Sequence, residues 1–303
     1  MITQDTISLI KSINDVELKC DEDMSLHTTL RMGGKAHVFV TVKTMSGLGE
    51  LIRVFKSVKS DYFLLGNGSN ILVSDKGLEM PVISLAGDFE KINIDGDTIK
   101  AGAAVLLSSV ARTALDNELS GLEFASGIPG SVGGAMVMNA GAYGGEMKDV
   151  VVTVKVMDEN GNVSEYTNEE MAFGYRDSIL KRKKLIVLET VFKLNKGDKE
   201  SIKNAMDELN KKRREKQPLE YPSAGSTFKR PEGYFAAKLI EDAGLKGYTV
   251  GGACVSEKHA GFCVNKDNGT ASDFYKLMAD VKDKVYESSG VSLEPEVIML
   301  GEF

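Results

Sequence analysis

The chain of 303 residues contains no tryptophan, six prolines and only three cysteines and three histidines. Cys20, Cys254 and Cys263 show no spacing typical of a metal or redox site, and an odd number of thiols gives no disulfide framework. The histidines likewise show no metal-ligand or triad spacing. We therefore expect no metal and interpret the cysteines as small core residues.

Long apolar runs are also missing. Nowhere do about 20 apolar residues follow one another, so we expect no membrane-spanning helix. The first residues, MITQDTISLIKSINDV, lack the positive start and unbroken apolar stretch of a secretory signal, which predicts a cytoplasmic protein. The formal charge of −7 argues against bulk nucleic-acid binding, although local lysines and arginines can still hold a small anion. The oligomeric state is not determined by these features; we favour a monomer.

The patterns that are present indicate an α+β protein with two or three lobes, since 303 residues exceed the usual size of one domain. Helical spacing of apolar residues predicts helices, and alternating or β-branched runs predict strands. The Asp95-Gly96 turn is expected to be type I′. Predicted helices lie near 3–16, 48–55, 105–118, 198–216, 235–245 and 272–288, and predicted strands and hairpins near 37–42, 62–66, 71–75, 91–102, 149–167, 185–194, 261–265 and 295–300.

Glycine is abundant, at 31 of 303 residues, and is concentrated in two stretches. These are LGNGSN at 65–70, directly after a predicted strand, and GIPGSVGGAMVMNAGAYGG at 127–145. Glycine lets successive backbone N–H groups turn toward one anion, so the two stretches predict a diphosphate site; tight turns are the alternative. Neither stretch matches G-x-G-x-x-G or a P-loop, which argues against an ordinary Rossmann or kinase fold.

Six separated motifs carry a closer resemblance. They are TLRMGGKA at 29–36, LLGNGSNILVSD at 64–75, GIPGSVGGAMVMNAGAYG at 127–144, GYRDS at 174–178, SAGSTFKRP at 223–231 and LEPEV at 293–297. In this order, over essentially the whole chain, they resemble the UDP-N-acetylenolpyruvoylglucosamine reductases, the MurB family of peptidoglycan synthesis. Only 50 positions separate the arginine of GYRDS from the second serine of SAGSTFKRP, so the chain resembles the shorter, second type of the family, without the lid of the longer form.

The resemblance implies FAD, bound by a fold of the vanillyl-alcohol-oxidase-like type with two α+β subdomains at 1–86 and 87–197. It also implies a C-terminal α+β substrate-binding domain at 198–303. Functions in cell wall biogenesis, cell shape and cell division follow from the same resemblance. The residues implied to contact FAD are Leu65, Gly66, Asn67, Gly68, Ser69, Asn70, Gly127, Ile128, Gly130, Ser131, Gly133, Gly134, Ala135, Asn139 and Gly141.

The family reaction implies three catalytic residues. NADPH reduces the flavin, which then delivers hydride to C3 of an enolpyruvyl ether on UDP-N-acetylglucosamine, giving UDP-N-acetylmuramate. Arg176 matches the family's arginine and suits a carboxylate whose charge grows in the transition state. Ser226 matches the proton donor to C2, and Glu296 matches the third catalytic residue. Without the resemblance, Arg176 suggests a surface ion pair, Ser226 a helix cap and Glu296 a solvated carboxylate.

Five further residues are candidate substrate contacts. Lys229 and Arg230 follow Ser226 closely enough to reach a diphosphate, and Lys238 lies on the next predicted helix. Tyr175 and His259 complete the set, with a structural role as the alternative for each. Two other functions stay open: a different FAD-dependent oxidoreductase of the same fold, or a nucleotide-sugar binding protein without turnover.

Overall fold

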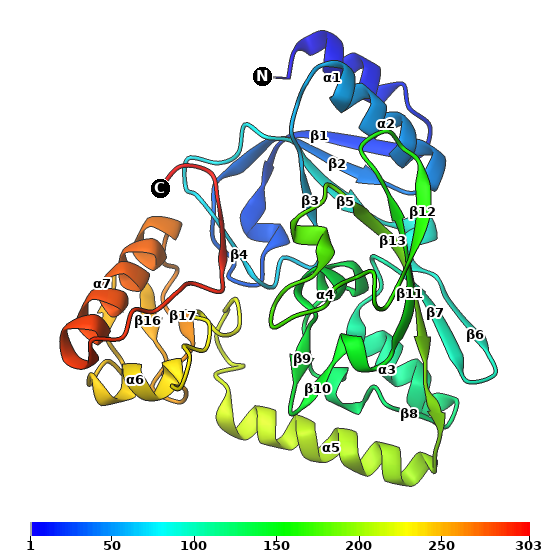
Figure 1. The fold of residues 1–303 in the computed structure, drawn as a ribbon. Coiled ribbons are helices and arrows are strands. Elements are labelled where there is room, and N and C mark those ends of the chain that lie inside the picture. Colours follow the sequence, from blue (N-terminus) through cyan, green and yellow to red (C-terminus); the bar gives the residue numbers. More distant parts are fainter. Residues whose placement is uncertain (1) are drawn as a thin grey trace. The chain divides into compact units, whose positions relative to one another are not determined.

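The computed structural model describes residues 2–303, and helices and strands are mixed throughout, which confirms the α+β class (Figure 1). The helices are α1 Gln4–Lys11, α2 Met45–Ser57, α3 Leu107–Asp116, α4 Val132–Met138, α5 Lys199–Lys216, α6 Ala236–Asp242 and α7 Ala271–Ser289. The strands are β1 Val16–Asp23, β2 Lys35–Val42, β3 Phe63–Leu65, β4 Ile71–Val73, β5 Val82–Leu85, β6 Ile92–Asp95, β7 Thr98–Gly102, β8 Leu119–Ser120, β9 Gly141–Ala142, β10 Gly145–Glu146, β11 Val151–Met157, β12 Val163–Thr167, β13 Ile186–Lys193, β14 Asn195–Lys196, β15 Thr249–Val250, β16 Ala253–Val255, β17 Cys263–Asn265 and β18 Ile298–Leu300.

The chain forms two compact units, each assembled from three segments. Unit 1 consists of Met1–Cys20, Val38–Asn67 and Met80–Lys212, and unit 2 of Asp21–His37, Gly68–Glu79 and Arg213–Phe303. Within the described residues no helix has the length and apolar character needed to cross a bilayer.

Unit 1 contains two hydrophobic clusters. In one, α1 and α2 pack on the parallel strands β2 and β5, and the buried side chains of α2 include Leu48, Leu51, Ile52 and Phe55 at the spacing of one helix face. In the other, α3 and α4 cover the antiparallel sheet β12-β11-β13-β7-β6. Helix α4 therefore packs against the antiparallel sheet.

Two local predictions are wrong. Cys20 is exposed rather than a core residue, whereas Cys254 and Cys263 are buried as expected. The second error concerns the hairpin of β6 and β7. The strands β6 and β7 pair up to Asp95 and Thr98, so the two loop residues are Gly96 and Asp97 rather than Asp95 and Gly96. Only Gly96 has a positive φ, of 61°. A type I′ turn needs positive φ at both loop residues, whereas a type II′ turn needs it at the first alone, which is the pattern observed.

Unit 2 packs α6 and α7 with the sheet β15-β16-β17 around one core. The core also takes Leu30, Met32 and Leu72 from the two early segments of the chain. Strand β18 pairs in parallel with β4, and the carboxylate of Asp75 accepts hydrogen bonds from the N–H groups of Ala271 and Ser272 at the start of α7. The early segments are therefore integral parts of this unit.

Candidate functional site

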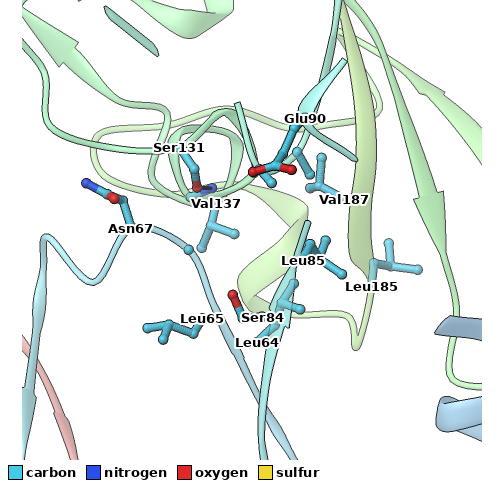
Figure 2. Close-up of a pocket in the computed structure, with 15 residues that line it drawn as sticks. Leu64, Leu65, Asn67, Ser84, Leu85, Glu90, Ser131, Val137, Leu185 and Val187 are labelled. Carbon is cyan, nitrogen blue, oxygen red and sulfur yellow. Dashed lines mark hydrogen bonds between the residues drawn. The ribbon is translucent and has the colours of Figure 1, made fainter. Parts of the chain in front are cut away.

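Unit 1 has a hollow of about 220 Å³ beside the first turn of α4 (Figure 2). The oxygens of Ser84, Glu90 and Ser131 contribute to a lining that is otherwise mainly aliphatic side chains and glycine backbone. Pockets for drug-sized ligands occupy roughly 300–1,000 Å³, so this hollow suits part of a dinucleotide rather than the whole. Its mixed lining suits a ligand with both apolar and hydrogen-bonding parts.

Helix α4 begins within the glycine-rich stretch because Ser131 caps it. The hydroxyl oxygen of Ser131 accepts a hydrogen bond from the N–H of Gly134, at 3.4 Å. The N–H groups of Val132 and Gly133 donate to carbonyls of Val105 and Ala103, each at 2.8 Å. These two N–H groups are thus used to dock the helix, not to face an anion.

The lining includes six of the residues expected to contact FAD, namely Leu65, Gly66, Asn67, Ser131, Gly133 and Gly134. Others in the glycine-rich stretch have structural explanations. Ala135 is buried in the core, and a side chain at Gly141 would come within 2.6 Å of the Gly145 carbonyl oxygen. Contacts of Gly127, Ile128, Gly130, Ala135, Asn139 and Gly141 with FAD stay predictions.

The rest of the first glycine loop, Gly68 to Asn70, belongs to unit 2. A side chain at Gly68 would come within 1.9 Å of the His27 carbonyl oxygen, so close backbone approach explains this glycine. The Asn70 amide donates to the Glu296 carbonyl at 3.1 Å, and the Asn70 carbonyl accepts from the N–H of Ile298 at 3.0 Å. The loop therefore fixes the segment that carries Glu296. FAD contacts of Gly68, Ser69 and Asn70 stay predictions.

Unit 2 also brings the segments of Ser226 and Glu296 together. Thr227, which is fully buried, accepts a hydrogen bond at its carbonyl from the N–H of Glu296, at 2.8 Å. Its hydroxyl accepts from the N–H of Cys263, also at 2.8 Å, and its own N–H donates to Gly261 at 2.9 Å. Ser226 itself is exposed. Because Thr227 makes these three hydrogen bonds, the backbone position of the neighbouring Ser226 is restricted.

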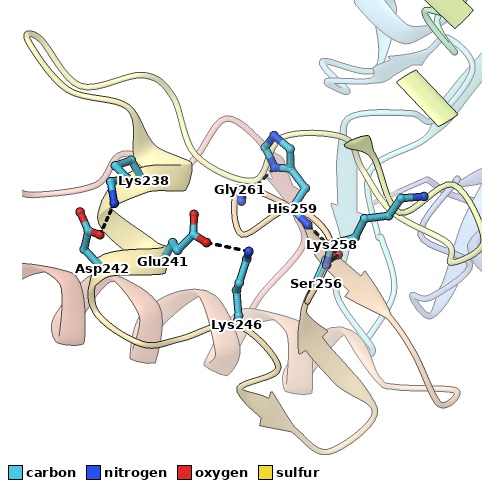
Figure 3. Close-up of polar contacts among 8 residues, drawn as sticks. All are labelled: Lys238, Glu241, Asp242, Lys246, Ser256, Lys258, His259 and Gly261. Carbon is cyan, nitrogen blue, oxygen red and sulfur yellow. Dashed lines mark hydrogen bonds and ion pairs between the residues drawn. The ribbon is translucent and has the colours of Figure 1, made fainter. Parts of the chain in front are cut away.

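Ser226 is not a helix cap, because the following helix α6 begins ten residues later with Phe235 at its N-cap position. Of the expected substrate contacts, Lys229 forms an ion pair with Glu294 on the neighbouring segment. The guanidinium of Arg230 lies 3.9 Å from the centre of the Phe235 ring. Lys238 pairs with Asp242 along α6 (Figure 3).

His259 lies in the loop that supports Thr227. Its Nδ1 accepts a hydrogen bond from the N–H of Gly261 at 3.1 Å (Figure 3). Its ring packs edge-on against the ring of Phe262. Burial lowers the pKa of His259, which favours the neutral ring. The neutral ring is also what an Nδ1 acceptor requires, since a protonated Nδ1 would direct N–H against N–H.

Arg176 lies in unit 1, in a tight turn between Gly174 and Asp177, with a positive φ of 53°. Its guanidinium lies 5.5 Å from the centre of the Tyr175 ring. Asp177 pairs with Arg182, and the Lys181 ammonium donates to the Arg176 carbonyl at 2.5 Å. A non-glycine residue with positive φ is uncommon and is often found at functional positions.

Reasoning from sequence did not anticipate several residues around the hollow. Ser84 and Leu85 lie on β5, which the sequence pattern does not predict, and Val137 lies on α4, within a stretch whose glycines predict a loop. Ala103 and Ala104 follow β7. Their small side chains were the one available signal, because small residues after a strand allow close approach of a ligand or another backbone.

Two family models match the chain. The model described as FAD binding domain matches residues 36–167, and the model described as UDP-N-acetylenolpyruvoylglucosamine reductase, C-terminal domain, matches residues 217–300. A reductase of that name from Caldanaerobacter subterraneus is 50% identical over 96% of both chains. The chain belongs to the UDP-N-acetylenolpyruvoylglucosamine reductase family.

Other members of this family agree. The reductase from Clostridioides difficile is 47% identical over 98% of this chain and 97% of its own. The crystal structure of the reductase (MurB) from Thermus caldophilus superposes with a TM-score of 0.82 at 38% identity, covering 94% of this chain and 99% of that one. The expected fold, FAD-binding domain and oxidoreductase class are therefore confirmed, and the reductase is favoured over the two alternative functions.

The hollow fits part of an FAD. A Cβ at Gly134 would meet only the Ser131 hydroxyl, at 3.5 Å, so the absence of a side chain there leaves open space. A Cβ at Gly66 would come within 2.7 Å of the same hydroxyl. Gly66, Gly134 and Ser131 thus form one wall of the hollow, and a larger side chain at either glycine would occupy the space beside it. Ser84 and Glu90 offer hydrogen-bonding groups to a ligand in the hollow.

Gly134→Leu should yield protein with little bound flavin, because the leucine side chain would fill the hollow. The helix itself should persist, since leucine has a higher helix propensity than glycine. Gly134→Ala adds only the Cβ and should retain flavin. Visible absorbance after purification measures flavin, and circular dichroism checks the fold. A yellow, fully loaded Gly134→Leu protein would show that the hollow is not the flavin site.

The lowered pKa of His259 means that the unfolded chain takes up the proton more readily than the folded protein. The contribution of His259 to the stability of the folded protein is complete above its pKa in the unfolded chain, about 6.5. It is lost as pH falls toward the lower pKa that His259 has in the folded protein. His259→Asn retains an oxygen acceptor near Nδ1 but does not titrate, so its stability should fall less between pH 7 and pH 5. Urea unfolding at several pH values across that range measures the free energy of unfolding. The same decrease with pH in the natural protein and in His259→Asn would contradict the prediction.

Proposed function

We propose that the enzyme uses NADPH to reduce the enolpyruvyl ether of UDP-N-acetylglucosamine to UDP-N-acetylmuramate, a step in peptidoglycan synthesis. The observation that carries this proposal is the backbone hydrogen bond that joins the Ser226 and Glu296 segments through Thr227. The close relatives bear the name of this reductase. FAD, when bound, supplies the hydride chemistry.

The substrate's chemistry defines what the side chains must do. Its alkene is electron-rich through the ether oxygen, so addition of hydride at C3 places negative charge on C2 and on the adjacent carboxylate. Arg176 is proposed to hold that carboxylate, because its planar donors match both oxygens and its charge stabilises the growing negative charge. Glu296 is proposed to assist at the same developing charge.

Ser226 is proposed to donate its hydroxyl proton to C2, which completes the reduction of the double bond. The serine oxygen then regains a proton from water, so the enzyme returns to its starting state. A hydroxyl is a weak acid, so this donation is suited to a strongly basic C2. Lys229, Arg230, Lys238, Tyr175 and His259 are retained as proposed contacts to the substrate.

Ser226→Ala should leave flavin reduction by NADPH within about two-fold of the natural enzyme and slow flavin reoxidation by the enolpyruvyl substrate about 10²–10⁴-fold, because only reoxidation needs the proton. Stopped-flow flavin absorbance separates the two half-reactions. Ser223→Ala, which removes a hydroxyl from the same loop, should change neither. Equal slowing of both half-reactions by Ser226→Ala would count against the assignment.

A further inference from the structure

Asn139 lies one residue beyond α4 and is 1% exposed. Its backbone has a positive φ of 40° and ends the helix. One N–H of its amide donates to the carbonyl of Gly174 and the other to the Glu146 carboxylate, each at 3.0 Å. The amide oxygen accepts from the N–H of Lys148, also at 3.0 Å. Both donors of the side chain therefore have protein partners.

The partner Gly174 begins the turn that carries Arg176. A second bond joins the same turn to α4: the Ser178 hydroxyl, 0% exposed, donates to the Val137 carbonyl at 3.0 Å. Val137 itself lines the hollow. The turn is thus attached to α4 on both sides of Arg176, and α4 also supplies the hollow with Gly133 and Gly134 from its first turn.

The electrostatic surroundings agree with this geometry. Lys148 lowers the pKa of the Glu146 carboxyl most strongly, Asn139 lowers it further and Arg176 adds a weaker contribution. The Glu146 carboxylate, to which Asn139 donates, thus also interacts with the charge of Arg176. Asn139 thereby links the helix, the turn and a charge that acts on the guanidinium.

We propose that Asn139 is a positioning residue, which sets Arg176 in a fixed position relative to the flavin hollow through its bond to the Gly174 carbonyl. It would act on the reaction without touching the substrate. This differs from the direct FAD contact expected from the sequence, since both N–H donors are already used. The inference rests on the proposed role of Arg176.

The main test is Asn139→Gly in the flavin-loaded enzyme. Glycine accepts positive φ, so the variant removes the amide while allowing the helix to end in the same way. Flavin content and reduction by NADPH should stay within about two-fold, while reoxidation by the enolpyruvyl substrate should slow about 10- to 100-fold, because small displacements of a positioning group are costly.

A double-mutant cycle separates positioning from a general structural role. In an Arg176→Ala background, Asn139→Gly should slow reoxidation by less than about two-fold, since there is no guanidinium left to position. Asn168→Ala is the matched control: its amide bonds the carbonyls of Lys148 and Val151 nearby but not the turn. That variant should reoxidise at the natural rate.

Two outcomes would overturn the inference. Loss of flavin in Asn139→Gly would make Asn139 a cofactor ligand, and full additivity with Arg176→Ala would make it structural only. If Asn139→Gly does not fold, Ser178→Ala tests the second attachment and should show the same non-additivity with Arg176→Ala. A natural enzyme that consumes no NADPH with this substrate would refute the proposed function instead.

Discussion

Buried polar side chains satisfy the irregular backbone on which the candidate site is built. In unit 2 the Thr227 hydroxyl accepts from the N–H of Cys263, while the Thr227 backbone carbonyl accepts from the N–H of Glu296. In unit 1 the Asn139 amide donates to the Gly174 carbonyl. Neither side chain is more than 1% exposed. A buried carbonyl or N–H without a partner costs about 1–3 kcal/mol, so these bonds restrict where the loops can lie. Specific hydrogen bonds therefore fix the loops that carry the proposed catalytic residues.

The longer elements were predictable from the sequence because local pattern and burial agree there. In α2 and α7 the helical spacing of buried apolar residues is sustained over several turns, and in β13 a β-branched apolar run is buried in the sheet. The cofactor class and the three catalytic candidates came from the order of six motifs, not from physical reasoning on any one of them. The comparisons confirmed the family and left the individual roles as proposals.

What the sequence did not reveal depends on long-range contacts. Helix α4 forms in a stretch whose glycines oppose helix formation, because Ser131 caps it and the carbonyls of Ala103 and Val105 receive its first N–H groups. Gly68 and Gly141 resemble anion-binding glycines. At each, however, a backbone carbonyl lies too close to leave room for a Cβ. Such packing reasons are invisible when only neighbours along the chain are considered.

The interleaving of the two units has a consequence for biosynthesis. The chain passes from one unit to the other five times, after residues 20, 37, 67, 79 and 212. Leu30, Met32 and Leu72 leave the ribosome early, but the helices that bury them in unit 2 are made last. These apolar side chains therefore lack their final packing partners until translation is nearly finished. A fragment containing only the C-terminal family domain would lack them, and its core would be incomplete.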